Sequence, residues 1–477
     1  MSGTGVRELM RGGTVHFMGI GGAGMCALAE AMVRQGGRVT GCDTAPGGSL
    51  EPLKKLGVTV FQGHGPEHVE GVAALVTTAA IPPDHPELAR ARERGVPVLK
   101  RARALGEWVN AGDVVAIAGT HGKTTTTAMT TEILARAGKE PTGFVGGWVT
   151  AWGGHLRPGS DRLYVVEADE YDRSFHHLRP TVAVVTNMEP DHLDVYGDFN
   201  GVRAGFRTFL DGVREGGTVL ACADDSGASS LLAGLAVEGR SFGFAAGSQF
   251  RGEALETSAS LTRFRVVEDG RNRGTLAVPI PGAHNAKNAL GAAAAARAMG
   301  ADWEAIRSAL ADFTGVARRF HRLGEFGGIT VVDDYAHHPT ELAAAIASGR
   351  QFFPDSRLVA VFQPHLYTRT RDFAQEFARV LATADVVWMA EIYPAREPAI
   401  PGVDGAFLAR EVERAADDGG KVREVILHTR LDDLAAALAA WLRPGDLCLT
   451  LGAGSIEKVG PALAERLHPA HAGSAHA

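Results

Sequence analysis

Residues 118–127 combine a glycine-rich turn with a lysine and a run of threonines, Ala-Gly-Thr-His-Gly-Lys-Thr-Thr-Thr-Thr. They follow the apolar run 114–117, which predicts a buried strand, and precede residues 129–135, which predict a helix. Such a turn points backbone N–H groups and the positive end of the helix at one place, where phosphate can bind. Lys123 adds a cation for the outer phosphates, and Thr124 adds a hydroxyl suited to Mg²⁺. The stretch therefore predicts a nucleoside triphosphate site and the use of ATP.

This loop is a short form of the phosphate-binding motif. The usual motif has a glycine five positions before Gly122, where this chain has Ile117, so the pattern reduces to Gly-x-x-Gly-Lys-Thr. The alternative interpretation is a tight turn with a surface lysine. The predicted strand and helix on either side favour the phosphate-binding interpretation.

Acidic clusters follow two further predicted strands. Residues 167–172 come directly after the apolar run 164–166, and residues 187–194 come after 182–186. An open parallel sheet binds its ligands at the carboxyl ends of its strands, and Mg²⁺ prefers carboxylate oxygens. Glu167 is therefore the best metal ligand candidate, whereas His192 could bind a second metal or contact phosphate. Each cluster taken alone could also be a solvated loop.

A second glycine-rich turn lies near the start of the chain. The predicted strand 14–19 runs into Gly-Ile-Gly-Gly-Ala-Gly at 19–24, followed by a predicted helix and the strand 38–43. Asp43 falls about 20 residues after the last glycine, where dinucleotide-binding folds place an acid on a ribose. The pattern predicts a diphosphate-bearing ligand, and NAD, FAD and a UDP-sugar all remain compatible with it.

Other candidate groups lie at the start of a predicted alanine-rich helix and in the last third of the chain. Asn285 and Asn288 at 284–289 could contact an adenine or ribose, but a helix cap explains Asn285 equally well. Arginines such as Arg369 and Arg371 suit carboxylate and phosphate recognition because a guanidinium binds two oxygens at once. The last third is therefore interpreted as the part that presents a small anionic substrate.

The elements that position these residues form an α/β pattern of about three domains, as expected for 477 residues at ~150 residues each. We expect Rossmann-like domains at 1–111 and 314–465, a P-loop domain with a parallel sheet at 112–313, and a disordered tail at 466–477. Residues 243–275 predict a small antiparallel insertion, and helices are expected at 289–298, 341–348 and 431–441.

Bulk composition excludes several classes of protein. The net charge of −7 argues against nucleic-acid binding, and no apolar run is long enough for membrane insertion. The N-terminus lacks the apolar region of a secretory signal. The four cysteines, Cys26, Cys42, Cys222 and Cys448, have neither metal nor redox spacing, which predicts a reducing, cytoplasmic location.

The order of these motifs resembles the Mur ligase family. The resemblance covers nearly all of 14–460 and includes the loops at 19–24 and 119–126, Glu-Ala-Asp-Glu at 167–170, Thr-Asn-Met-Glu-Pro-Asp-His-Leu-Asp at 186–194, His-Asn-x-x-Asn at 284–288 and Asp-Asp-Tyr-Ala-His-His-Pro-Thr-Glu at 333–341. It implies ATP- and Mg²⁺-dependent ligation of an amino acid to the lactyl carboxylate of UDP-N-acetylmuramate in peptidoglycan synthesis. Residues 362–370 resemble members that add L-alanine more than members that attach a recycled tripeptide.

The resemblance also implies roles for individual residues. ATP would be bound by Gly119, Thr120, His121, Gly122, Lys123, Thr124, Thr125, Asn285, Asn288 and Arg319. The UDP-sugar would be bound by Gly19, Gly21, Gly22, Gly24, Asp43, His64, Thr78 and Ala79. Alanine would be bound by Arg369, Arg371 and His337, with Thr124, Glu167 and His192 as metal ligands. Lys123, His192 and His337 would be catalytic, although His337 could equally only hydrogen-bond in the core.

Several points remain open in the sequence. Sister ligases have a carbamylated lysine after the Asp-His-Leu-Asp motif, but here no lysine occurs between His192 and Cys222, where Arg203 and Arg207 lie. The preference among alanine, serine and glycine is open, as is the choice between a monomer and a weak homodimer. A nicotinamide oxidoreductase would leave Lys123 and Thr124 unexplained, and a regulatory or motor ATPase would leave the first domain without a role.

Overall fold

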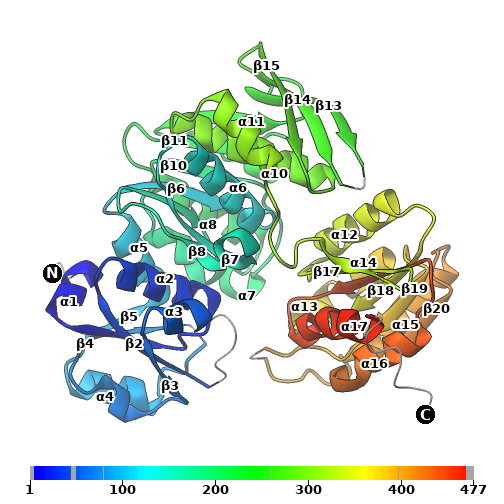
Figure 1. Cartoon of the computed structure of the whole chain (residues 1–477), viewed down its shortest axis with the longest axis horizontal. Helices are drawn as coiled ribbons and strands as arrows, with labels where there is room; N and C mark the ends of the chain where they lie inside the picture. Colours follow the sequence, from blue (N-terminus) through cyan, green and yellow to red (C-terminus); the bar gives the residue numbers. More distant parts are fainter. Residues whose placement is uncertain (1–4, 45–49, 79, 259, 396, 469–477) are drawn as a thin grey trace. The chain divides into compact units, whose positions relative to one another are not determined.

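The computed structural model describes residues 5–44, 50–78, 80–258, 260–395 and 397–468. The chain forms two compact units, one of Met1–Glu256 with Thr262–Val316 and one of Thr257–Leu261 with Ala317–Ala477. Three sheets that are mostly parallel confirm the expected three-domain α/β class (Figure 1). The described helices include none with the length and apolarity needed to cross a bilayer.

The first unit begins with a five-stranded parallel sheet of order β3-β2-β1-β4-β5. Its elements are α1 Val6–Gly12, β1 Thr14–Met18, α2 Ala23–Arg34, β2 Arg38–Asp43, α3 Glu51–Lys55, β3 Thr59–Gln62, the 3₁₀ helix η2 Pro66–Val69, β4 Val72–Thr77, α4 Pro86–Glu93, β5 Val98–Lys100 and α5 Arg101–Val109. The predicted strand at 38–43 matches β2. Ala79, a predicted sugar-binding residue, lies outside the described residues.

The same unit contains a ten-stranded sheet of order β15-β14-β13-β12-β11-β10-β6-β9-β7-β8. Its elements are β6 Asp113–Ala118, α6 Lys123–Arg136, β7 Thr142–Val149, η3 Thr150–Trp152, β8 Gly154–Arg157, β9 Leu163–Glu167, η4 Tyr171–His177, β10 Val182–Val185, α7 Leu193–Tyr196, α8 Phe199–Asp211, β11 Thr218–Cys222, α9 Ser226–Ser230, β12 Glu238–Gly243, β13 Phe250–Thr257, β14 Thr262–Glu268, β15 Arg271–Val278, α10 Ala283–Ala298 and α11 Trp303–Ala311. The antiparallel strands expected near 243–275 are the pair β14–β15, which extends the main sheet through β13.

Both faces of the central sheet are buried, as the continuous apolar strands predict. Val115 and Ile117 of β6 face the core formed with α6, α10 and α11. Val114 and Ala116 face a second core, which continues into the five-stranded sheet through Trp108 of α5. Because this core is shared, the first two sheets form one compact unit, and loops from both can line one site.

The second unit has a six-stranded sheet of order β16-β17-β21-β18-β19-β20, antiparallel only between β16 and β17 in its recorded pairings. Its elements are β16 His321–Phe326, β17 Ile329–Asp334, α12 Pro339–Phe352, β18 Arg357–Phe362, α13 Tyr367–Asp372, α14 Ala374–Leu381, β19 Val386–Met389, α15 Gly405–Asp417, β20 Glu424–Leu427, α16 Leu431–Trp441, β21 Asp446–Leu451, η5 Ser455–Lys458 and α17 Val459–Leu467. Because α17 continues to Leu467, the first two residues of the expected tail are helical, and residues 469–477 lie outside the described part.

Candidate functional site

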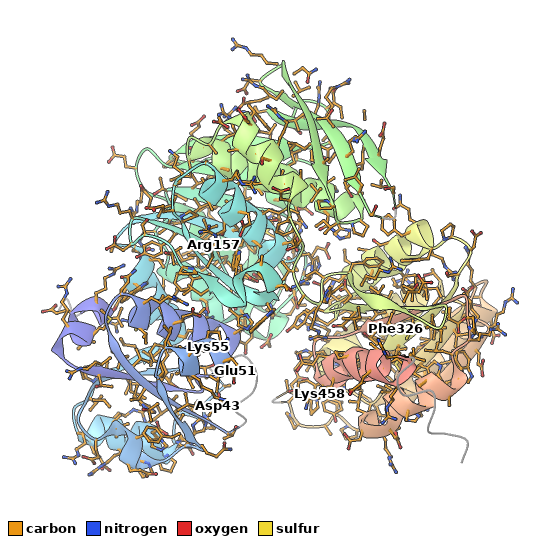
Figure 2. All side chains as sticks on the ribbon, in the orientation of Figure 1. Asp43, Glu51, Lys55, Arg157, Phe326 and Lys458 are labelled. Atoms are coloured by element: carbon orange, nitrogen blue, oxygen red, sulfur yellow. The ribbon has the colours of Figure 1, made fainter. Side chains whose placement is uncertain are left out.

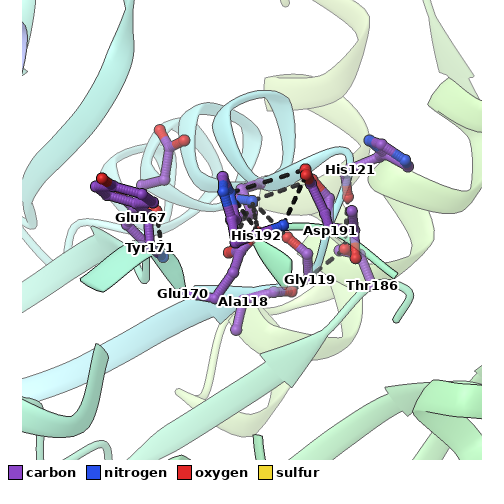
Figure 3. A network of polar contacts seen from close by, with 12 residues as sticks. Ala118, Gly119, His121, Glu167, Glu170, Tyr171, Thr186, Asp191 and His192 are labelled. Carbon is purple, nitrogen blue, oxygen red and sulfur yellow. Dashed lines mark hydrogen bonds and ion pairs between the residues drawn. The ribbon is translucent and has the colours of Figure 1, made fainter. Parts of the chain in front are cut away.

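The loop between β6 and α6 is held in shape by the chain that follows β10. The backbone N–H of Thr120 donates to the Asn187 carbonyl at 3.2 Å, and that of His121 donates to Asn187 Oδ1 at 2.8 Å. Asn187 Nδ2 and Thr186 Oγ1 donate to the His121 carbonyl at 3.0 and 2.6 Å (Figure 3). The carbonyl of His121 is therefore turned toward the protein, and four hydrogen bonds hold the loop.

Both glycines of this loop are required by geometry. Gly119 has φ +135°, and an added Cβ would lie 2.0 Å from Thr186 Oγ1. Gly122 has φ +82°, and an added Cβ would lie 2.4 Å from Asn288 Oδ1. The predicted ATP residues Gly122 and Asn288 are thus in contact, which joins the loop to the start of α10.

Replacing Gly122 by alanine is expected to weaken ATP binding by about tenfold or more, because it adds a clash with Asn288 to a left-handed backbone strain of about 1–2 kcal/mol. Gly138→Ala, at the other end of α6, is the matched control: Gly138 has φ +71° and open space around its Cβ position. Calorimetric titration with ATP and thermal unfolding should show lost stability in both variants but lost binding only in Gly122→Ala. Equal ATP affinity in the two variants would refute the role of the contact.

Lys123, the first residue of α6, is folded back onto its own loop. Its Nζ donates to the carbonyls of Gly119 and Thr120 at 2.6 and 3.1 Å, and to Glu170 Oε1 at 2.9 Å. Burial opposes the charge on Lys123, but Glu170 and Asp169 outweigh it and raise the pKa of the ammonium. Burial raises the pKa of Glu170 to about 7, against the opposing effect of Lys123. Glu170 therefore holds a charged lysine beside the loop.

Thr124 and Glu167 form a pair of hard oxygen donors. Thr124 Oγ1 donates to Glu167 Oε1 at 2.9 Å, and Glu167 Oε2 accepts from the Gly146 N–H at 2.6 Å. Neighbouring oxygens of an octahedral Mg²⁺ site with bonds of about 2.0–2.1 Å lie about 2.9 Å apart. The two predicted ligands thus fit a magnesium ion in spacing and in chemistry.

His192 contacts a different carboxylate. Its Nε2 lies 3.9 Å from Glu170 Oε1 and 3.7 Å from Asp191 Oδ2, and its ring meets Tyr171 edge-on at 5.1 Å (Figure 3). The structure therefore brings His192 to the Lys123–Glu170 pair. Its assignment as a metal ligand stays a prediction.

The first glycine loop is braced by two predicted residues. Asp43 Oδ2, at the end of β2 (Figure 2), accepts the Gly21 N–H at 2.8 Å, and a Cβ on Gly19 would lie 3.0 Å from Thr78 Cγ2. Gly19, at φ +83°, makes the turn into α2. His64 lies near the same strand end, with its Nδ1 3.0 Å from Cys42 Sγ and its ring against His85, and its contact with the sugar nucleotide stays a prediction.

The first glycine loop and the chain at the end of β9 line one cavity of about 240 Å³ within the first unit. Its lining comprises Gly22, Ala23, Gly24, Met25, Ala27, Thr78, Arg101, Leu105, Phe144, Val145, Gly146, Glu167 and Asp169. The metal ligand candidate Glu167 and the glycine loop thus share one space. A ligand on the glycine loop can place a reacting group beside Glu167.

Sequence reasoning missed three residues of this site. Arg101 lines the cavity, 3.8 Å from Asp169 and so close to Gly24 that a Cβ there would lie 2.9 Å from its Nη1. Glu170 and Asn187 belong to the clusters at 167–172 and 187–194. Their position directly after predicted strands could have indicated a role in the site. Arg101 had no such signal, because it follows a short strand in a segment without a motif.

The two asparagines lie inside the first turns of α10. The helix begins at Ala283 after Gly282, which makes no side-chain cap bond, so the helix-cap explanation of Asn285 is wrong. Both side chains are buried; Asn285 Nδ2 donates to the Pro281 carbonyl at 2.6 Å, and Asn288 Nδ2 donates to Asn285 Oδ1 at 3.2 Å. Their contact with ATP stays a prediction.

Arg203 and Arg207, in the region where sister ligases have a carbamylated lysine, both lie on α8. Arg203 stacks over the Phe199 ring at 5.7 Å, and Arg207 Nη2 donates to the Ala233 carbonyl at 2.9 Å. These contacts secure the helix and its neighbouring loop. They give neither arginine the role of the missing lysine.

In the second unit, His337 is oriented by two acceptors. Its Nδ1 lies 3.1 Å from the Tyr335 carbonyl and 3.1 Å from Glu341 Oε2. Both neighbours are acceptors, so a proton on Nδ1 can bond to them and leave the lone pair of Nε2 for a substrate. This arrangement suits a general base.

Two of the three predicted arginines join this region. Arg319 lies 3.7 Å from Glu341 and over the Tyr335 ring, and the buried Arg369 lies 3.5 Å from His365, whose ring is next to His337. Arg371 is exposed and pairs with Asp372 at 2.7 Å. The structure thus does not bring Arg371 to the group.

Comparisons with known proteins agree over most of the chain. Residues 14–112, 117–296 and 318–454 match the models "Mur ligase family, catalytic domain", "Mur ligase middle domain" and "Mur ligase, glutamate ligase domain". The UDP-N-acetylmuramate–L-alanine ligase of Salinibacter ruber is 42% identical over 95% of this chain and 94% of its own, and that of Oleidesulfovibrio alaskensis is 41% identical over 94% and 97%.

Solved structures of two ligases are similar to this chain over nearly their whole length. The UDP-N-acetylmuramate-alanine ligase of Thermotoga maritima superposes with a TM-score of 0.81 at 28% identity, over 95% of this chain and 99% of its own. A murein peptide ligase of Psychrobacter arcticus gives 0.72 at 25% identity, over 96% and 99%.

Proposed function

The chain belongs to the Mur ligase family, and from that premise we propose that it ligates L-alanine to the lactyl carboxylate of UDP-N-acetylmuramate with ATP. The products are UDP-N-acetylmuramoyl-L-alanine, ADP and phosphate, in peptidoglycan synthesis. The observation that carries the proposal is the shared cavity, in which the glycine loop and Glu167 face one space. An oxidoreductase would not need Lys123 and Thr124, and a regulatory ATPase would not need the glycine loop.

The chemistry requires activation of the carboxylate, which is a poor electrophile. The lactyl carboxylate attacks the γ-phosphorus of ATP and forms an acyl phosphate, with ADP as the leaving group. The alanine amine then attacks the acyl carbon, and the tetrahedral intermediate expels phosphate. A closed site protects the acyl phosphate from water.

Lys123 would change its hydrogen-bond partners when ATP binds. Its Nζ bonds two loop carbonyls and Glu170, and a γ-phosphate would replace the two neutral carbonyls with charged oxygens. The ammonium then stabilises charge on the transferring phosphoryl group. Glu170 keeps the amine protonated until that exchange.

Thr124 and Glu167 would hold Mg²⁺, which when bound neutralises charge on the phosphate oxygens. On the sugar side, Asp43 fixes the Gly21 N–H, and the start of α2 is suited to the diphosphate. In the second unit, His337 Nε2 would take the proton from the alanine ammonium, with Arg369 near the amino-acid carboxylate. The enzyme is expected in the cytoplasm, where its nucleotide substrates are made, as a monomer or weak homodimer.

Removing Arg101 is expected to raise KM for UDP-N-acetylmuramate about 10- to 100-fold with a smaller effect on kcat, because a hydrogen bond to a charged group is worth about 1.5–3 kcal/mol. The expectation follows from its place between Gly24 and Asp169. Arg103→Ala is the control, since Arg103 is exposed on the same helix and pairs with Glu107. Steady-state kinetics with the sugar nucleotide varied test it; an unchanged KM in Arg101→Ala excludes the role.

The function is tested by the dependence of ADP release on the acceptor substrates. ADP and phosphate should form at a substantial rate only when UDP-N-acetylmuramate and L-alanine are both present. Equal ATP turnover without them would favour the regulatory ATPase, and hydride transfer to NAD would favour the oxidoreductase. Competition among alanine, serine, glycine and the recycled tripeptide in the same assay identifies the amine substrate.

A further inference from the structure

Beneath the five-stranded sheet lies a buried cluster of metal-binding side chains that the ligation mechanism does not use. His16 of β1, Cys42 of β2, His68 of η2 and Glu87 of α4 each offer one donor atom, and these atoms all lie within 4.8 Å of one another. His16, Cys42 and Glu87 are fully buried, and the His68 side chain is 8% exposed. From this juxtaposition we propose that the N-terminal domain binds a zinc ion, separate from the magnesium that serves ATP.

Strand alternation explains how these residues come together. Val15 and Phe17 of β1 face the core shared with α2, so His16 faces the opposite side, where Cys42 joins the smaller core formed with α4. In Figure 1, α2 and α4 lie on opposite sides of this sheet. The cluster therefore lies on the side of the sheet away from the core shared with the P-loop domain.

Three of the four donor atoms have the spacing of tetrahedral coordination. His16 Nε2 lies 3.2 Å from Glu87 Oε1 and 3.4 Å from Cys42 Sγ. Cys42 Sγ lies 3.5 Å from Glu87 Oε1, and Glu87 Oε2 lies 3.6 Å from His68 Nδ1. Donors bound to zinc at about 2.0–2.3 Å in a tetrahedron lie roughly 3.3–3.7 Å apart. His16 Nε2, Cys42 Sγ and Glu87 Oε1 thus have the spacing of ligands to one ion, and His68, whose donor atom lies within 4.8 Å of the others, would move toward that ion to complete the set.

The donor types select the metal. Two imidazoles, one thiolate and one carboxylate form a mixed set that suits zinc, whereas Mg²⁺ takes oxygen ligands only. Binding replaces the thiol hydrogen of Cys42 by the metal and releases that proton to solvent. The ion also neutralises the buried Glu87, whose ion-pair partners among the described residues are His16 and His68.

A neighbouring contact orients one ligand. His16 Nδ1 lies 2.9 Å from Thr40 Oγ1, so a proton on Nδ1 can bond the hydroxyl and leave the lone pair of Nε2 facing the cluster. Outer hydrogen bonds of this kind are the usual support of histidine ligands. Cys42 Sγ also lies 3.0 Å from His64 Nδ1, so the bound ion would fix the loop after β3 as well.

The test uses the full-length protein, stripped with a chelator under reducing conditions and then dialysed against Zn²⁺ with excess Mg²⁺. We expect about one zinc per chain by elemental analysis, and a higher melting temperature with zinc. With Co²⁺ as the probe, wild-type protein should show thiolate-to-cobalt charge transfer and the visible bands of tetrahedral cobalt. Absence of zinc or of these bands in the wild-type protein overturns the proposal whatever the variants do.

Variants assign the signal to this cluster. Cys42→Ser should abolish the charge-transfer band and weaken zinc binding at least about tenfold, and Thr40→Val should weaken it about 10- to 100-fold with the band retained. Cys222→Ser, at a buried cysteine of β11, is the control and should bind as wild type. Zinc binding of equal affinity in Cys42→Ser and Cys222→Ser overturns the assignment. Because the readout is metal content, its failure would leave the proposed ligase activity untouched.

Discussion

Lys123→Ala is expected to lower kcat/KM for ligation by about 10³-fold or more, the effect of losing a cation from a transferring phosphoryl group. The amine is the first residue of α6 and lies on the phosphate-binding loop, where it bonds the Gly119 and Thr120 carbonyls. ADP formation with saturating UDP-N-acetylmuramate and L-alanine measures the loss.

A second variant separates catalysis from folding. Removing Lys123 takes away the nearest ion-pair partner of the buried Glu170, so the single variant should also be less stable near neutral pH. Lys123→Ala combined with Glu170→Gln removes both charges and should recover melting temperature but not ligation. Recovered ligation would mean that Lys123 only neutralises Glu170. Lys139→Ala, at an exposed lysine just beyond α6, should behave as wild type.

The sequence was most informative where chemistry and local structure depend on the same residues. The runs 182–185 and 431–441 match β10 and α16, because β-branched and alanine-rich segments have strong local preferences. The predicted helix 341–348 begins earlier, at Pro339, because His338 and Glu341 form a capping box before it.

The contacts that complete the candidate site are non-local, and spacing does not reveal them. The sequence predicted that Lys123 and Glu167 lie near phosphate. The pairing of Lys123 with Glu170 depends on how the chain after β9 folds against the phosphate-binding loop. Arg101 reaches Gly24 only because α5 packs between two sheets that share a core. His64 and Cys42 were assigned separately, although the register of β2 and β3 brings the chain around them together.

Glu167→Gln is expected to lower kcat/KM about 10²-fold or more and to shift the Mg²⁺ dependence of ligation to higher concentrations, because the metal contributes several kcal/mol to transition-state charge. The substitution keeps the size of the side chain but removes the negative charge that Mg²⁺ requires. One oxygen of Glu167 accepts from Thr124 and the other from Gly146, so the amide can satisfy only one of these contacts as an acceptor. Initial rates over a Mg²⁺ titration at saturating ATP measure both effects.

The control for charge and strand position is Asp161→Asn, at an exposed residue just before the other end of β9. It removes the same charge from the same unit, so a general electrostatic effect on ATP would affect both variants alike. A local metal role requires the Mg²⁺ midpoint to move in Glu167→Gln alone. If the midpoint stayed at the wild-type value while kcat fell, Glu167 would act by bracing Gly146 and Thr124, and the metal would have other ligands.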